Sequence, residues 1–179
     1  MTWQIDYSHS HIYFTARHMM ISKVRGRFSQ WEGAIEFDEQ NPENTTVDVT
    51  VQMDSIHTRD DQRDGHLRSP DFFNVAEFPQ MTFKSNRVIM ESVNEGKLYG
   101  DLTIRGVTKE VMLVVEYAGQ AKSPWGTISA GFSAKGSLNR KDWGLTWNQA
   151  LETGGVLVGE KVEIEIELEL VKQPEAVPA

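Results

Sequence analysis

The sequence predicts an all-β protein, an elongated antiparallel barrel of eight strands with one or two short helices. Apolar and polar residues alternate with period two in one segment after another, which is typical of strands with one buried face. Turn signals such as Asn94-Glu95-Gly96 and Ser123-Pro124-Trp125-Gly126 make short connections, so neighbouring strands should be antiparallel. Several segments are about 10 to 12 residues long, and long antiparallel strands tend to close because closure removes exposed edges.

The eight expected strands are spread over most of the chain. In order, they cover residues 11–17, 31–38, 46–54, 81–90, 98–104, 111–117, 127–138 and 161–170. The last is the clearest, because charged and apolar residues alternate without exception from Lys161 to Leu170. Residues 111–117 are apolar on both faces, which predicts that something covers the outside of this strand. The polar run 60–67 predicts a short helix or capping loop with Asp60 as its N-cap.

Length and composition exclude several classes of protein. The 179 residues suit one domain, expected over residues 1–172, and the two prolines of residues 173–179 predict a flexible tail. With no cysteine there is no disulfide framework, thiolate metal site or cysteine nucleophile. A net charge of −8 argues against nucleic acid as a partner and against docking on anionic lipid heads.

The start of the chain bears on localisation. It has no signal-peptide pattern, and no apolar run is long enough for a membrane helix. We therefore expect no stable membrane insertion and a cytoplasmic protein as written, or a periplasmic or extracellular one if a natural signal peptide has been removed.

Small residues recur on the apolar faces of the expected strands and raise the question of a cavity. They leave volume unfilled, which predicts a long, narrow apolar space that a ligand would fill; they are Ala16, Gly33, Gly100, Ala130, Ala134 and Gly136. The alternative is a solid core, filled by the aromatic side chains Phe14, Trp31, Phe37, Phe83 and Phe132. Glycine in a strand also often marks a bulge or bend, so the pattern alone leaves both interpretations open.

Motifs for catalysis or metal binding are weak. His9 and His11 have a His-x-His spacing that would place two imidazoles on one strand face as a zinc pair, but no HExxH motif accompanies them. The sequence also lacks G-x-S-x-G and a Gly-rich phosphate loop. We expect no catalytic residues, no metal site and no cofactor.

Four segments in a fixed order resemble the YceI-like family. The first is Trp3-x-Ile5-Asp6-x-x-His9-Ser10, and the second is Gly26-x-Phe28 with Gly33-x-Ile35-x-Phe37-Asp38. The third is the most specific and joins Ser55-Ile56-x-Thr58, His66-Leu67-Arg68-Ser69-x-Asp71-Phe72-Phe73 and Phe78-Pro79. The fourth joins Gly100-Asp101-Leu102-Thr103-Ile104-Arg105-Gly106-Val107-Thr108 to Arg140-x-Asp142-x-Gly144-Leu145.

The resemblance implies a lipocalin-like barrel around a central apolar tunnel, and homodimers. It also implies non-enzymatic carriage, storage or sequestration of a long-chain amphiphile such as a polyisoprenoid, an isoprenoid quinone or a fatty-acid derivative. The ligand cavity is then favoured over the solid core, and its expected lining is Ile12, Phe14, Ala16, Trp31, Val49, Phe83, Leu102, Ile128, Ala130, Phe132, Ile164 and Ile166. The segment that carries His66, Leu67, Phe72 and Phe73 should either cover a mouth of the barrel or plug its end.

Two other functions remain as alternatives. One is an enzyme that acts on a lipid-like substrate in the same cavity, with His9, His18 or His66 as acid or base. The other is an interaction protein with a packed barrel, which would use the doubly apolar strand 111–117 as its partner surface.

Overall fold

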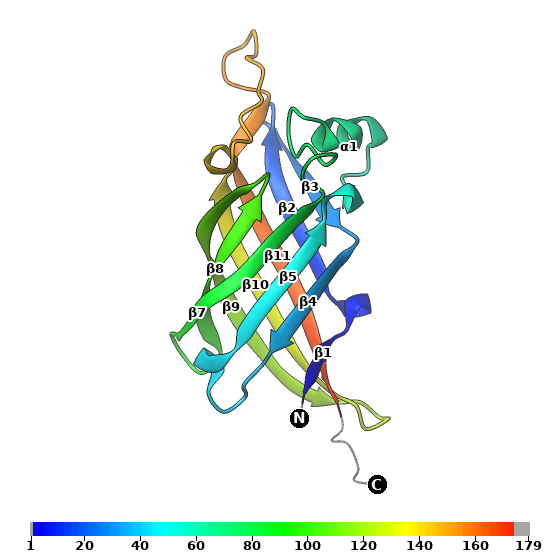
Figure 1. The fold of residues 1–179 in the computed structure, drawn as a ribbon, viewed down its shortest axis with the longest axis vertical. Coiled ribbons are helices and arrows are strands. Elements are labelled where there is room, and N and C mark those ends of the chain that lie inside the picture. The colour runs from blue at the N-terminus through cyan, green and yellow to red at the C-terminus, as the bar shows by residue number, and fades with distance from the viewer. Residues whose placement is uncertain (1, 174–179) are drawn as a thin grey trace.

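The protein curls one antiparallel sheet around an apolar interior (Figure 1). The structure is a computed structural model that describes residues 2–173. These residues form the strands β1 (Trp3–Ile5), β2 (His11–His18), β3 (Ser22–Phe28), β4 (Trp31–Glu36), β5 (Thr46–Gln52), β6 (Ile56–His57), β7 (Gln80–Met90), β8 (Glu95–Ile104), β9 (Val107–Lys122), β10 (Ile128–Asn139) and β11 (Val158–Lys172). The all-β antiparallel fold is confirmed, and the expected tail, apart from Gln173, lies outside the described residues.

The number of strands differs from the prediction, because residues 2–173 hold eleven strands and not eight. β1 and β6 have three and two residues, which are too few to show an alternation. β3 was not predicted from the sequence for another reason. Its inner face consists of Val24, Gly26 and Phe28, and the central glycine interrupts the apolar pattern.

Within residues 2–173, the curled sheet has two margins, β4 on one side and β3 with β6 on the other, which are linked by individual hydrogen bonds and not by a strand ladder. The strand order is β4-β5-β7-β8-β9-β10-β11-β2-β3-β6, with β1 paired to β11. Between these margins the Gly33 amide donates to the Tyr7 hydroxyl over 3.2 Å, and the Ser29 amide donates to the Ser55 carbonyl over 3.3 Å. The N-terminal segment and the turn before β6 therefore join the two margins of the curled sheet.

A β-bulge in β9 adds to the curl. Gly131 pairs with Gly119, but the next residue, Phe132, pairs with Tyr117, so Ala118 has no partner on β10. Gly119 has a φ of +96°, a conformation that glycine adopts without strain. A bulge of this kind bends its strand and increases the local twist, which long strands need to wrap around a lumen.

The sheet is accompanied by short helices. α1 (Asp61–Arg68) begins at the predicted N-cap, where the Asp60 carboxylate accepts a hydrogen bond from the Arg63 amide over 3.0 Å. The other helices are 3-10 turns: η1 (Tyr7–His9), η2 (Pro42–Asn44), η3 (Met53–Ser55) and η4 (Arg140–Trp143). Within residues 2–173, none of these helices is long and apolar enough to cross a bilayer.

Candidate functional site: an apolar cavity along the barrel

A cavity of about 880 Å³ runs along the inside of the curled sheet. The size is within the range of known ligand sites, about 300–1,000 Å³. Ten of the twelve residues expected in its lining do line it: Ile12, Phe14, Ala16, Trp31, Val49, Phe83, Leu102, Phe132, Ile164 and Ile166. Their contact with a ligand stays a prediction.

Ile128 and Ala130 do not line this cavity, although their side of the strand was the expected one. They pack instead around Trp3 and Leu170 at the end of the barrel where β1 begins and β11 ends. Ala130 pairs with Leu170 and is completely buried. Alternation fixes the face of a residue, but the depth of the lumen at that residue depends on strands far away in the sequence.

The lining also contains residues that sequence reasoning did not assign. Val51, Leu98 and Leu138 share a face with expected lining residues on their own strands, so strand parity was a sufficient signal for them. Leu113 and Val115 belong to the doubly apolar strand, whose inner face could not be chosen from the sequence. Phe28 also lines the cavity, and it was not assigned because its strand, β3, was not predicted.

The inward glycines hold aromatic rings against the wall of the barrel. A Cβ atom at Gly100 would lie 2.2 Å from the ring of Phe83, and one at Gly26 would lie 2.2 Å from the ring of Phe14. Gly100 and Gly26 are therefore not holes, because a ring occupies the place of each missing side chain. At Gly33 and Gly136, which the small-residue argument also counted as unfilled, the side chains of Ile5 and Leu113 take that place. The rings lie flat along the sheet instead of across the lumen, which leaves the central space open.

Gly100→Ala is expected to lower the free energy of unfolding by about 1–3 kcal/mol and to reduce the retention of a long apolar ligand. The new methyl group would also lie 2.8 Å from the Lys84 carbonyl oxygen, so the Phe83 ring must turn into the lumen and the backbone must shift. Urea unfolding and ligand extraction measure the two effects. Gly131→Ala on β10 is the matched control, because its methyl group meets only the Ala118 Cβ at an ordinary 3.5 Å. Equal unfolding midpoints for the two variants would contradict this account.

One end of the cavity is open and has a polar rim. Val93, in the turn between β7 and β8, lines the cavity and is 88% exposed. The Glu39 carboxylate, also in the lining, accepts hydrogen bonds from Gln120 Nε2 over 2.5 Å and from Lys172 Nζ over 3.1 Å. The hydrogen bond from Gln120, and then that from Lys172, lower the pKa of Glu39 against the opposing effect of burial. Asn94 and Lys97 add further polar groups at this end.

A cap of residues 58–79, made of α1 and the loop that follows it, lies at the other end of the barrel (Figure 1). Leu67, Phe72 and Phe73 of the cap line the cavity, together with Trp143. Trp143 is buried, and its indole Nε1 donates to the Leu102 carbonyl over 3.0 Å. The cap therefore provides the apolar floor of the cavity. His66, the fourth expected cap residue, is not in the lining, because it pairs with Asp71 over 2.9 Å and packs against Trp147.

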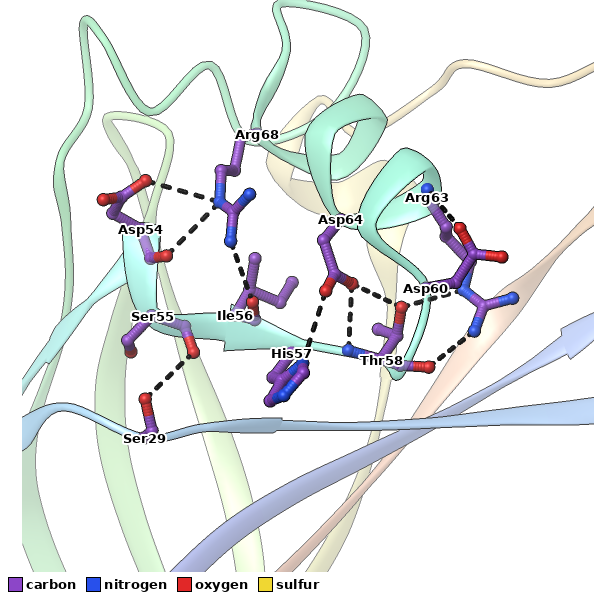
Figure 2. Close-up of polar contacts among 10 residues, drawn as sticks. All are labelled: Ser29, Asp54, Ser55, Ile56, His57, Thr58, Asp60, Arg63, Asp64 and Arg68. Atoms are coloured by element: carbon purple, nitrogen blue, oxygen red, sulfur yellow. Dashed lines mark hydrogen bonds and ion pairs between the residues drawn. The ribbon is translucent and has the colours of Figure 1, made fainter.

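A buried polar network fastens the cap to β6 (Figure 2). The Asp64 carboxylate accepts hydrogen bonds from the Thr58 amide over 2.9 Å, from the Thr58 hydroxyl, and from His57 Nδ1 over 3.4 Å. Burial by itself would raise the pKa of Asp64, but the hydrogen bonds from Thr58 and then His57 outweigh it and lower the pKa. Arg63 of α1 donates to the Thr58 carbonyl, which adds a second link between the helix and Thr58.

Arg140 is the charged residue at the capped end of the lining. It is 4% exposed, and its guanidinium donates to the carbonyl oxygens of Leu145, Val158 and Gly159. Burial lowers its pKa. These bonds join the end of β10 to the start of β11 and supply donors to three backbone carbonyls of this irregular part of the chain.

The five histidines lie outside the cavity lining. The His-x-His spacing does not place two imidazoles on one strand face, because His9 is in η1 while His11 begins β2. His9 pairs instead with Asp6 over 2.8 Å and lies near Glu169 over 3.8 Å. The hydrogen bond that His9 Nδ1 donates to the Asp6 carboxylate raises the pKa of His9.

Comparisons with known proteins agree with this architecture. A UPF0312 protein from Staphylococcus aureus is 41% identical over 165 residues, which make up 92% of this chain and 94% of that protein. The crystal structure of the Campylobacter jejuni YceI protein has a TM-score of 0.76 and 33% identity, over 88% of this chain and 90% of that one. A polyisoprenoid binding domain from Saccharophagus degradans shares the fold, with a TM-score of 0.67 and 15% identity over 97% of this chain and 99% of that one.

A comparison with protein families matches residues 3–170 to the YceI-like domain. The match covers nearly the whole described chain, from β1 to the last residues of β11. The chain belongs to the YceI-like family.

Proposed function

We propose that this protein binds a long-chain amphiphilic lipid inside the barrel and carries, stores or sequesters it without chemical change. The observation that supports the proposal is the cavity itself: about 880 Å³ with an almost wholly apolar lining, a polar rim at one end and an apolar floor at the other. The polyisoprenoid binding domain that shares the fold indicates one suitable ligand class. An isoprenoid quinone or a fatty-acid derivative has the same long apolar tail.

The geometry suggests the direction in which such a ligand lies. The tail would extend along the apolar lining towards Phe73 and Trp143, and the head group would remain at the rim near Glu39, Gln120 and Lys97. Each buried CH₂ group contributes about 0.8 kcal/mol, so a long tail can bind tightly without specific polar contacts. We expect selection by tail length and shape, with weak discrimination between head groups.

The enzymatic alternative receives less support from the cavity. A histidine acid or base would have to face the substrate, but His9, His18 and His66 are all outside the lining. The titratable side chains that do line it are Tyr13, Glu39, Lys97, Tyr117 and Arg140. We therefore favour binding over catalysis.

Organic extraction of the purified protein followed by mass spectrometry tests the proposal. We expect a prenyl or acyl compound in the extract, and a higher melting temperature of delipidated protein on addition of such compounds. The absence of any bound lipid, together with no stabilisation by prenyl or long-chain acyl probes, would overturn the proposal.

We also propose that the homodimer implied by the family forms through the outer face of β9. In this strand Val111, Leu113 and Val115 face the cavity, whereas Met112 and Val114 face outward, which accounts for the apolar character of both faces. Met112 is 39% exposed.

Val114→Glu is expected to produce monomers, because a dimer through this face would bury an unpaired carboxylate. Sedimentation velocity measures the state. Lys122→Glu, a charge change at the far end of the same strand, is the control and should leave the dimer intact. An unchanged sedimentation coefficient for Val114→Glu would rule out this face as the interface.

A further inference from the structure

The turn between β2 and β3 exposes three consecutive aliphatic residues. Met19, Met20 and Ile21 are 40%, 61% and 80% exposed. Met19 and Met20 also have φ angles of +53° and +63°, in the left-handed region where glycine or asparagine is the ordinary choice. Glycine or asparagine would relieve the backbone strain at Met19 and Met20 and reduce the apolar exposure. The Met20 side chain lies against Gly155 in the loop before β11, so packing accounts for part of its presence, but not for Ile21, the most exposed of the three.

The strands that flank this turn are cationic on their outer face. Arg17 of β2 and Lys23 of β3 are exposed cross-strand partners, and like charges in that arrangement destabilise a hairpin. Arg25 and Arg27 continue the charge along β3, and no acidic residue lies between Arg17 and Arg27. Arg25 lies 3.7 Å from Glu165. Within the described chain, Arg17, Lys23 and Arg27 form no such ion pair.

The hairpin formed by β2 and β3 is positively charged near its turn, whereas the protein as a whole is negatively charged. The whole chain carries −8, with 26 acidic against 18 basic residues, so its average charge would repel an anionic surface. The acidic residues nearest to the turn along the adjoining loop and strand are Glu152 and Glu160, and Glu160 is paired with Lys141 over 2.7 Å. The tip therefore combines exposed aliphatic side chains with unpaired cations.

We propose that this hairpin tip, residues 17–25, docks the protein on anionic lipid bilayers. Met19, Met20 and Ile21 would enter the interface shallowly, and Arg17 and Lys23 would contact the anionic head groups. Charge complementarity favours an anionic bilayer over a generic apolar partner, because the same surface carries the cations and the aliphatic residues. Three aliphatic residues and a few cations give weak, reversible and salt-sensitive binding.

The position of the tip determines which end of the barrel would face the bilayer. Figure 1 shows the turn between β2 and β3 at the same end of the barrel as α1 and the loop before β11. Docking would place the cap, which forms the floor of the cavity, against the bilayer. The open polar rim would then face away from the bilayer, so the exchange of cargo with the membrane, which the proposed function requires of a lipid carrier, would have to pass through the cap.

Vesicle flotation of the full chain tests the docking. We expect the protein to float with phosphatidylcholine vesicles that contain phosphatidylglycerol, to float poorly with phosphatidylcholine alone, and to be released by salt. Lys23→Glu and Ile21→Ser are each expected to lower the partition onto anionic vesicles, by about tenfold for the charge reversal. Neither residue lines the cavity, so both variants should keep any lipid that co-purifies with the wild type.

The controls match the variants in chemistry but lie at the opposite end of the barrel. Lys122→Glu changes the net charge by the same amount as Lys23→Glu, and Trp125→Ser removes an aromatic residue that is 88% exposed. Both should float like the wild type. Equal losses of vesicle binding in Lys122→Glu and Lys23→Glu would mean that only the net charge of the protein matters, and they would overturn the proposal.

The remaining outcomes separate docking from cargo binding. Protein that retains lipid but does not float with anionic vesicles at low salt would refute the docking and leave the proposed function intact. Protein that floats through its tip but holds no lipid would refute the proposed function alone. Self-association that Ile21→Ser abolishes, without any flotation, would make the tip an interface between copies and would also overturn the docking.

Discussion

Ala134→Trp is expected to abolish the retention of a long-chain lipid while the chain remains folded. Ala134 lines the cavity from the middle of β10, and its neighbours across the sheet are Val115 and Ile166. An indole at this position would cross the lumen and block the path from the polar rim to the cap. Because the lumen offers space, we expect a stability change of only about 1–3 kcal/mol. Extraction with mass spectrometry and thermal unfolding measure the two quantities.

Lys135→Trp is the matched control, because its side chain points to the solvent from the same strand and does not line the cavity. It should retain ligand like the wild type. Full retention of a long-chain lipid by Ala134→Trp would mean that the ligand does not occupy the central lumen.

Asp64→Ala is expected to lower the free energy of unfolding by about 2–4 kcal/mol. The substitution leaves the amide and hydroxyl of Thr58 without their shared acceptor, and Thr58 is buried. The cap should loosen as a consequence, so hydrogen exchange of α1 and β6 should become faster. Asp61→Ala removes an exposed carboxylate from the same helix and should change stability by no more than about 1 kcal/mol. Similar urea midpoints for the two variants would contradict the role of the network.

The Asp64 carboxylate should also make the cap sensitive to acid. Its pKa in the folded protein lies below the ordinary aspartate value of 3.8, so the folded state favours the charged form. This stabilisation is fully present above the unfolded value and is lost as the pH falls through the folded one. The stability difference between wild type and Asp64→Asn should therefore be constant near neutral pH and shrink below about pH 3.8. A difference that does not change in acid would show that the charge contributes nothing.

The alternation of residues predicted the fold class and the inner face of most strands. β11 shows why: from Lys161 to Leu170 each inward residue is apolar and each outward residue is charged, and the period of a strand is a property of adjacent residues only. The same rule placed Ile12 and Phe14 on β2 and Leu102 on β8 in the lining. It failed for β3, where Gly26 interrupts the pattern to make room for the ring of Phe14 on the neighbouring strand.

The candidate site was predictable in kind but not in detail. The depth of Ala130 could not be inferred, because it depends on pairing with Leu170, 40 positions away in the sequence. The sequence also contained no indication that a glycine makes room for a neighbouring ring, since the ring that covers Gly100 belongs to Phe83 of β7. The net charge of −8 gave no sign that Arg17 and Lys23 would meet across one hairpin beside an apolar turn.

The sequence by itself determined that this chain forms strands, that their apolar faces turn inward, and that Asp60 begins a helix in the cap. These features depend on residues within a few positions of one another, and local periodicity records them. The tertiary structure decided that the sheet leaves a cavity of about 880 Å³, which end of it is capped, and where the cations gather. Those features depend on the register between distant strands and on how side chains from different strands pack against one another. A local sequence pattern contains neither kind of information.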